Sequence, residues 1–433
     1  MPIPSAIAAP VLPGWAVPPR FTGPCLASLL PVAARAAGID LGPMPGTPDR
    51  APVTLPGRTG TELDSVKARC VIVVLADGLG FHNLAERAGH TRFLRRQATA
   101  QWVTGFPSTT VASLATFGTG LAPGRTGMAG YALRDPVTGR RAVLINWDTP
   151  TPAERWQPEP TLFDAMVRAG RPGTFIGQAR FEHSPLSRAT LRGSSFVAAE
   201  KPKERVSAAV RAAKAGGVVY LYWGELDKAG HRAGWRSAQW LRALENFDSA
   251  MAALAAAAPS GTEIWITADH GMVDVSGGPE WDVAKVPELA EGVAVVAGEP
   301  RTLDLYVEGV GPEARVFDDP ARIPAWDGPA LDPAATAEAA GAVAARWRGV
   351  LGDQAWVLTR DEAIAAGLFG DVTGRVRPLL GDVVVAMAGN ASVVDTRIKP
   401  PKTVSGHPAG PMIGHHGSLT APEMHIPLIR VAA

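Results

Sequence analysis

Residues 71–76 read VIVVLA, an uninterrupted run of apolar, mostly β-branched side chains that ends at Asp77. A run of this kind is expected for a central strand that is buried on both faces of a parallel sheet. Two further runs have the same character, VVYLYW at 218–223 and EIWIT at 263–267. Segments with helical periodicity alternate with these runs, so the sequence predicts an α/β fold with a mainly parallel central sheet.

A second stretch, FPSTTVASLATFGTG at residues 106–120, joins three consecutive hydroxyl residues to a run of small residues. It predicts a helix that begins near Val111, which places Thr110 at the helix N-terminus. Free N–H groups and the positive end of the helix dipole meet there, and both suit a nucleophile that must ionise and meet a phosphate. An ordinary N-cap is the alternative interpretation, because Ser and Thr are preferred there for stability alone.

Each of the three apolar runs leads into an aspartate: Asp77, Asp227 and Asp269. In open α/β sheets, ligands bind beyond the carboxyl ends of the strands. His231 lies four residues after Asp227, a spacing that places both side chains on one face of a helix. His270 directly follows Asp269, where the chain turns. A helix cap or an Asx turn is the alternative for any one of these aspartates, but less so for all three together.

A pair of histidines near the C-terminus, His415 and His416, supplies further imidazole. Three carboxylates and three imidazoles form a mixed oxygen and nitrogen ligand set, which suits zinc, with manganese as the alternative. Six ligands exceed those of one tetrahedral zinc, so we predict two divalent metal ions a few ångströms apart. Such a pair stabilises both the attacking and the leaving oxygen of a displacement at phosphorus.

Composition narrows the class of protein. Of the 433 residues, 46% are hydrophobic and 19% are charged, which allows a large core. The formal net charge of +1 gives no reason to expect nucleic acid or an anionic membrane as a partner. Two cysteines, Cys25 and Cys70, form no CxxC pair, which argues against a disulfide framework. Because the N-terminus lacks a basic segment and no apolar run approaches ~20 residues, we expect a soluble cytoplasmic protein.

The pattern changes along the chain and suggests domain boundaries. The first residues are rich in Pro, Gly and Ala, and a separate small α/β unit follows the last of the three strands. The apolar end, Ile426 to Val431, is expected to rejoin the main sheet. We predict an irregular N-terminal arm packed on the core at 1–65, a core at 66–285 and 401–433, and an inserted cap at 286–400.

Five motifs occur in a fixed order between residues 71 and 418: VLADGLG, FPSTTVASLATFGTGLAPGRTG, ELDKAGHRAG, ADHGM and HHGS. In these motifs the chain resembles the alkaline phosphatase superfamily, and most closely its nucleotide pyrophosphatase/phosphodiesterase branch. The resemblance implies an alkaline-phosphatase-like three-layer sandwich with a mainly parallel central sheet and a small inserted α/β cap.

The resemblance also implies roles for single residues. Thr110 falls where that branch has its threonine nucleophile. His416 is preferred to His415 as a ligand because it directly precedes Gly417. The resemblance implies that Ser113 binds a phosphate oxygen. The branch usually has an asparagine at this position. The implied ligands form two sets, one for each zinc ion: Asp227, His231 and His416, and Asp77, Asp269 and His270 next to the Thr110 oxygen.

The implied function is that of a two-metal phosphoester hydrolase, most closely a nucleotide pyrophosphatase/phosphodiesterase, which acts through a covalent phospho-threonine on a small-molecule phosphoester such as a nucleotide. A phosphomonoesterase, a phosphonate hydrolase or a phosphosugar mutase of the same superfamily is the alternative, as is a non-catalytic scaffold braced by metals. A dinucleotide fold is disfavoured because Asn83 replaces the third glycine of its fingerprint. The basic stretch Arg134 to Arg141 is interpreted as a solvated loop, with substrate contact as the alternative.

Overall fold

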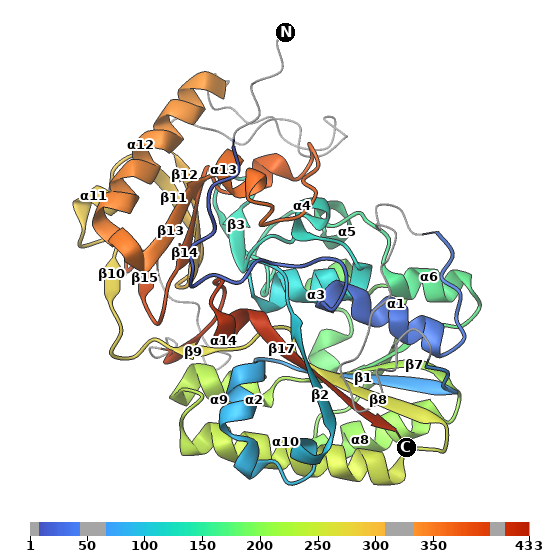
Figure 1. Cartoon of the computed structure of the whole chain (residues 1–433). Coiled ribbons are helices and arrows are strands. Elements are labelled where there is room, and N and C mark those ends of the chain that lie inside the picture. The colour runs from blue at the N-terminus through green and yellow to red at the C-terminus, as the bar shows by residue number, and fades with distance from the viewer. Residues whose placement is uncertain (1–7, 44–65, 308–332, 399–411, 433) are drawn as a thin grey trace.

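The computed structural model of the chain describes residues 8–43, 66–307, 333–398 and 412–432. A seven-stranded sheet lies at its centre (Figure 1). Strand β17 is antiparallel to both of its neighbours, and the other six strands share one direction. The strands occur in the order β2 (Ala98–Val103), β17 (His425–Ala432), β8 (Thr262–Thr267), β1 (Cys70–Ala76), β7 (Gly217–Trp223), β5 (Thr174–Gly177) and β6 (Ser195–Ala198).

Helices cover both faces of this sheet, which confirms the predicted α/β class with a mainly parallel central sheet. All residues of β1 are buried, as expected for a strand that lies between two helical layers. One layer contains α1 (Leu26–Ala36), α3 (Thr110–Thr119) and α6 (Leu162–Arg168), and the other contains α8 (Pro202–Ala213), α9 (Glu225–Ala233) and α10 (Ala238–Ala257).

The N-terminal segment contributes a helix to the core. Ten of the eleven residues of α1 are buried, and Arg35 is the exception. The helix packs against β1 and α3, so this part of the chain belongs to one of the two helical layers. The rest of the predicted N-terminal arm, at 1–7 and 44–65, lies outside the described residues, and the domain boundaries stay a prediction.

A second, four-stranded antiparallel sheet lies beside the first (Figure 1). Side chains alternate along β14, so Val383 and Val385 pack under α12 while Val384 and Ala386 pack in the cluster that contains Phe106. The second sheet therefore has one face toward its own helix and the other toward the core. Its members are β11 (Val293–Glu299), β12 (Thr302–Val307), β14 (Val383–Met387) and β13 (Ala355–Thr359), with α12 (Pro333–Leu351) across them.

Shorter elements connect the two sheets and shape the space between them. The hairpin of β3 (Ala132–Arg134) and β4 (Arg141–Val143) packs on β11. Strand β16 (Gly414–His415) pairs with β9 (Val273–Asp274), which joins the C-terminal segment to the loop after β8. The remaining short elements are α2 (Phe81–Glu86), α4 (Pro123–Thr126), α5 (Ala153–Trp156), α7 (Pro185–Leu191), β10 (Glu280–Asp282), α11 (Pro287–Ala290), α13 (Arg360–Ala365), β15 (Ser392–Val394) and α14 (Ala421–Met424).

Within the described ranges, no helix has both the length and the apolar character that crossing a membrane would require.

Candidate active site

The register of the central sheet brings the three strand-end aspartates together. Strand β1 pairs in parallel with β7 and β8, and the three strands end level with one another, since Leu75 lies opposite both Tyr222 and Thr267. Asp77 directly follows β1, and Asp227 lies in the first turn of α9, directly after β7. The expectation that polar residues gather at the carboxyl edge of the strands is therefore met in the structure.

One group of potential ligands consists of Asp77, Asp269 and His270, all buried. The Nε2 atom of His270 lies 3.4 Å from Asp77 Oδ1 and 3.5 Å from Asp269 Oδ2. The other oxygen of Asp269 accepts hydrogen bonds from the N–H groups of Gly78 and His270, at 3.2 and 3.0 Å. Because one oxygen is fixed in this way, the other is directed into the group.

The second group consists of Asp227, His231 and His416. Asp227 Oδ1 lies 3.2 Å from His231 Nε2 and 3.8 Å from His416 Nε2. The two Nε2 atoms are 3.3 Å apart, and the ring of His416 stacks on that of His270 with centroids 3.7 Å apart. The two groups are therefore adjacent. The structure brings together all six residues that the sequence assigned to metal binding.

The three imidazoles share one tautomer. His231 Nδ1 lies 2.7 Å from the carbonyl oxygen of Gly414, and His270 Nδ1 lies 3.0 Å from that of Gly271. His416 Nδ1 lies 3.0 Å from the carbonyl oxygen of Ser108. A carbonyl oxygen only accepts, so each Nδ1 carries the proton and each Nε2 has a free lone pair. This is the usual arrangement of histidines that ligate a metal.

The carboxylates fit divalent cations. Each keeps one buried oxygen without a hydrogen-bond partner, namely Asp77 Oδ1, Asp227 Oδ1 and Asp269 Oδ2. Burial, together with the nearby charges of Asp269 and Asp227, raises the pKa of Asp77 well above its usual value. A buried group of like charges is unfavourable unless cations compensate it. Buried oxygen atoms and imidazole lone pairs that face one another form a donor set that suits zinc or a similar ion.

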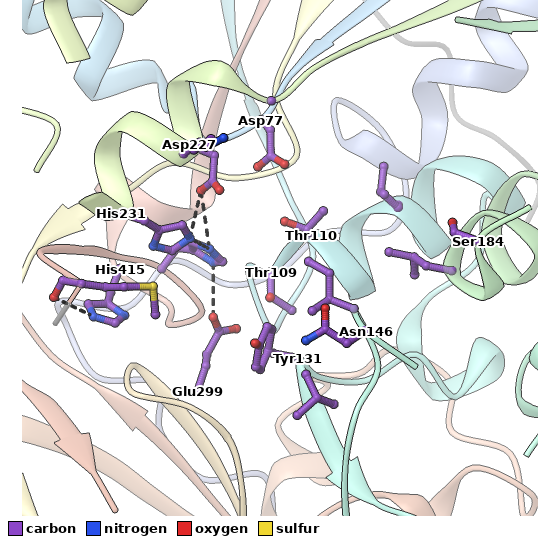
Figure 2. A pocket seen from close by; sticks show the side chains of 18 of the residues that line it. Asp77, Thr109, Thr110, Tyr131, Asn146, Ser184, Asp227, His231, Glu299 and His415 are labelled. Carbon is purple, nitrogen blue, oxygen red and sulfur yellow. Dashed lines mark hydrogen bonds and ion pairs between the residues drawn. The ribbon is translucent and has the colours of Figure 1, made fainter. Parts of the chain in front are cut away.

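Thr110 lies beside the first group. It is the first residue of α3, as the sequence predicted for the helix N-terminus, and its Oγ1 lies 3.2 Å from His270 Nε2. Thr109 occupies the N-cap position, but its side chain makes no capping hydrogen bond. Figure 2 shows Thr110, Asp77 and Asp227 around the same part of the pocket. The hydroxyl of Thr110 thus faces the ligands and does not serve as a helix cap.

The structure places Ser113 and His415 outside both groups of ligands, which for His415 agrees with the preference for His416. Ser113 is buried outside the lining of the cavity, and its hydroxyl donates to the carbonyl oxygen of Asp269 at 2.9 Å. That bond supports a ligand loop, and the role of Ser113 in binding a phosphate oxygen stays a prediction. His415 lies against the ring of His231, with centroids 6.0 Å apart, and belongs to neither group of ligands.

The second sheet supplies a residue that sequence reasoning missed. Glu299, at the end of β11, points toward the ligands from the opposite wall (Figure 2), and its Oε2 lies 3.5 Å from His416 Nδ1. Burial raises the pKa of Glu299 well above its usual value. Gly417, with φ of +123°, leaves room for it, because a Cβ there would lie 2.9 Å from Glu299 Oε1. No motif marks Glu299, and the signal in the sequence is an acid at the end of a strand, just before a short turn.

Tyrosines line the cavity on both sides. Tyr222, in β7, donates a hydrogen bond to Asp77 Oδ2 and so orients that carboxylate. Tyr131, just before β3, lies near Glu299 on the other side (Figure 2). The whole cavity measures about 1570 Å³, which is large enough for a nucleotide-sized molecule.

Comparison with known protein families agrees with this geometry. The model of the type I phosphodiesterase / nucleotide pyrophosphatase family matches residues 71–419, which include all six ligands and Thr110. The chain belongs to this family. This phosphodiesterase-family protein is therefore a hydrolase that acts on phosphoester bonds, and its family membership confirms the resemblance seen in the motifs.

Solved structures show the same fold. Murine ectonucleotide pyrophosphatase/phosphodiesterase 5 aligns with a TM-score of 0.59 and 16% identity, over 83% of this chain and 87% of that chain. An inactive variant of that murine protein in complex with AMP gives 0.59 and 15% over the same shares. Phosphonoacetate hydrolase from Sinorhizobium meliloti 1021, in complex with phosphonoacetate, gives 0.58 and 17%, over 88% of this chain and 93% of that chain. A search of curated proteins found no match to this phosphodiesterase-family chain.

Proposed function

We propose that this protein is a two-metal phosphodiesterase or nucleotide pyrophosphatase whose nucleophile is Thr110. The observation that carries the proposal is the position of Thr110 Oγ1, 3.2 Å from His270 Nε2, at a helix N-terminus. A hydroxyl in this position has the ligands of one cation on one side and the free N–H groups of the first turn on the other. Such a position favours an alkoxide and the negative phosphoryl group that it would attack.

The six ligands would hold two divalent cations, which we propose to be zinc: Asp77, Asp269 and His270 for one, and Asp227, His231 and His416 for the other. When bound, the cations would supply Lewis-acid stabilisation of the nucleophile, the phosphoryl oxygens and the leaving oxygen. The chain itself orients the ligands, through the backbone carbonyl groups that hold each Nδ1 and through Tyr222, which holds Asp77.

The reaction has two displacements at phosphorus. In the first, the hydroxyl of Thr110 loses its proton as Oγ1 forms a bond to phosphorus, the bond to the leaving oxygen breaks, and the leaving oxygen takes up a proton. In the second, water attacks the phospho-threonine, the bond between Thr110 Oγ1 and phosphorus breaks, and the hydroxyl regains its proton. Thr110, Asp77 and Asp269 are buried, so charges on these side chains are screened by solvent less than charges at the surface.

The substrate class is proposed as small phosphodiesters, nucleotides included. Structures with this fold bind AMP in one case and phosphonoacetate in another, which supports a small phosphate- or phosphonate-containing molecule. A phosphonate hydrolase is the second candidate, because the structure of phosphonoacetate hydrolase matches this chain about as well as the murine phosphodiesterase does. Zinc-loaded protein assayed on thymidine 5′-monophosphate p-nitrophenyl ester, p-nitrophenyl phosphate and phosphonoacetate separates the candidates, with a chelator as control.

Replacement of the nucleophile tests the mechanism. We expect Thr110→Ala to lower kcat by at least about a thousandfold on the preferred substrate, because loss of a nucleophile removes the covalent route. Metal analysis should still find close to two equivalents. Thr116→Ala is the matched control, since Thr116 is a buried threonine of the same helix whose hydroxyl has no hydrogen-bond partner in the described residues.

Two results would contradict the proposed function. Substantial turnover by Thr110→Ala would rule out Thr110 as the nucleophile. Tight binding of two metals by the wild-type protein without turnover of any phosphoester or phosphonate would favour a metal-braced scaffold.

A further inference from the structure

The hairpin of β3 and β4 places an arginine in the wall of the cavity. Arg134 pairs with Arg141 across the hairpin, and Ala132 pairs with Val143. Val143 packs with Ala297 of β11, which fixes the hairpin on the strand that ends in Glu299. Arg141 and Val143 both line the cavity, as alternation along a strand allows. The basic stretch that we interpreted as a solvated loop therefore reaches the pocket at Arg141.

Arg141 is half-buried but has no bonded partner. Within the described residues, its guanidinium makes no hydrogen bond and no ion pair, although Asp148 and Asp395 lie within electrostatic range. Both of these carboxylates are engaged elsewhere: Asp148 accepts from the N–H of Val143, and Asp395 binds Arg397 at 2.7 Å. Burial lowers the pKa of Arg141. Its donors therefore remain available for a ligand in the cavity.

Other buried arginines of this protein show what is missing at Arg141. Arg205, Arg301 and Arg360 are each engaged by a carboxylate. Taking a guanidinium out of water without a partner costs free energy, because it loses hydrogen bonds to solvent. A planar guanidinium with free donors matches the two oxygens of a carboxylate or a phosphate. Unlike these three arginines, half-buried Arg141 has no carboxylate partner in the described residues, so it can bind an anionic ligand.

Arg141 lies in the same cavity as the metal ligands, on the wall that carries Glu299. Tyr131 lies within electrostatic range of both Arg141 and Glu299, and Glu299 approaches His416 at 3.5 Å. Arg141 therefore lies on the same wall as Glu299, and both residues are near Tyr131. Three exposed cations also line the cavity: Arg180, Lys228 and Arg232. Outside the ligand groups the cavity is lined by five cations, with Arg141 and Arg205 included, and by three acids, Glu225, Glu299 and Asp395, so positive charge exceeds negative charge there.

We propose that Arg141 binds a second anionic group of the substrate, a carboxylate or a phosphate that is separate from the phosphorus attacked by Thr110. The inference rests on the proposed function, because it assumes that the phosphoryl group lies at Thr110. It makes the substrate a phosphoester with a second oxyanion on its organic part. Arg141 is then a specificity-determining residue, and Thr110 and the metal ligands carry out the chemistry.

Three synthetic diesters with the same p-nitrophenolate leaving group test this inference. Their second ester arm ends in a carboxylate (2-carboxyethyl), a phosphate (2-phosphoethyl) or a neutral carboxamide (2-carbamoylethyl). For the zinc-loaded wild-type protein we expect kcat/KM to be about 10- to 100-fold higher for one of the anionic diesters than for the carboxamide. Charge-assisted, bidentate hydrogen bonds from an arginine are stronger than hydrogen bonds between neutral groups. Whichever anionic diester is preferred identifies the carboxylate or the phosphate as the ligand.

Variants separate Arg141 from the general charge of the pocket. Arg141→Gln should bring the preference for the anionic diester close to one, and Arg141→Lys, which keeps the charge but loses the planar fork, should keep part of it. Arg140→Gln is the matched control, because Arg140 is the exposed neighbour that does not line the cavity. It should keep the wild-type preference. Thermal unfolding of each variant reports whether the protein keeps its wild-type stability.

Other outcomes would overturn the inference. A wild-type protein without preference for either anion has no second anion site. An equal loss on all three diesters in Arg141→Gln would mean that Arg141 serves the scissile phosphoryl group or the fold. If none of the diesters is hydrolysed, the proposed function fails, and titration of the metal-loaded protein with the same three compounds decides the inference by itself. Tighter binding of an anionic diester, lost in Arg141→Gln, would support the site, and equal binding of all three would overturn it.

Discussion

The two walls of the pocket differ in how they are built. The wall at the edge of the central sheet carries Thr110 and the two ligand groups, whereas the wall formed by the second sheet and its hairpin carries Glu299, Tyr131 and Arg141. On the first wall, level parallel strands place carboxylates within a few ångströms of one another. On the second wall, packing of a short hairpin on β11 decides which side chains face inward. We infer that the first wall supplies the chemistry and the second selects the substrate.

The largest effect is expected from replacement of a carboxylate on the first wall. Asp269 is fully buried, and its Oδ2 has no partner within the chain. We expect Asp269→Asn to lower kcat by more than about a hundredfold, because loss of residues that merely orient metal ligands already costs 10- to 100-fold. Bound zinc should fall from two equivalents toward one. Asp248→Asn is the control, since Asp248 is a buried aspartate whose oxygens accept from the N–H groups of Phe93 and Leu94, away from the pocket.

Retention of two zinc ions and of normal turnover in Asp269→Asn would remove the basis for assigning the chemistry to this wall.

On the second wall, Glu299 offers a sharper test of the division. It belongs to neither ligand group, and the Nδ1 of His416 that it approaches is already bonded to Ser108. We therefore expect Glu299→Gln, which keeps the size and removes the ionisable group, to change kcat by less than about tenfold, below the range for groups that orient metal ligands. Metal content, measured together with kcat and KM, should stay at two equivalents. If Glu299→Gln lost a metal ion, Glu299 would be a metal ligand, and the two walls would not have separate roles.

The smallest effect is expected at Asp304, which lies in β12 and does not line the pocket. Burial raises the pKa of Asp304 to about 7, above its value in the unfolded chain. The native state then holds a proton that the unfolded state has released, so stability from this group is present below about pH 4 and is lost as the pH rises through 7. Asp304→Asn lacks this loss.

The pH dependence of unfolding checks this prediction. The Tm of Asp304→Asn relative to wild type should be higher at pH 8 than at pH 4.5 by roughly 2 to 5 °C. Activity should stay close to that of the wild type. A difference in Tm that is independent of pH would show that Asp304 is ionised in the native protein throughout this range.

The sequence predicted the first wall well because its signals are local. The branched apolar run before Asp77 predicts a buried strand, and the structure has β1 at Cys70–Ala76. The spacing of Asp227 and His231 predicts one helical face, and both residues lie in α9 with 3.2 Å between their ligand atoms. The strand and the helix each depend on residues that are close together in the sequence. These features can therefore be predicted from the sequence alone.

Side-chain direction was harder to predict. The family resemblance implied that Ser113 binds a phosphate oxygen, but its hydroxyl donates to the carbonyl oxygen of Asp269. The neighbouring loop decides this contact, and no spacing in the sequence reveals it. Arg141 shows the converse, because a residue in a basic stretch faces the cavity once its hairpin packs on β11.

The sequence by itself determined the strands, the helix that begins at Thr110 and the identity of the potential ligands, since each depends on interactions between near neighbours. The family resemblance already implied that His416 would meet Asp227, and only the tertiary structure decided that Glu299 and Arg141 would face the same cavity. The physical reason is that contacts between distant segments depend on strand register and on the packing of one sheet beside another, which no short stretch of the chain encodes.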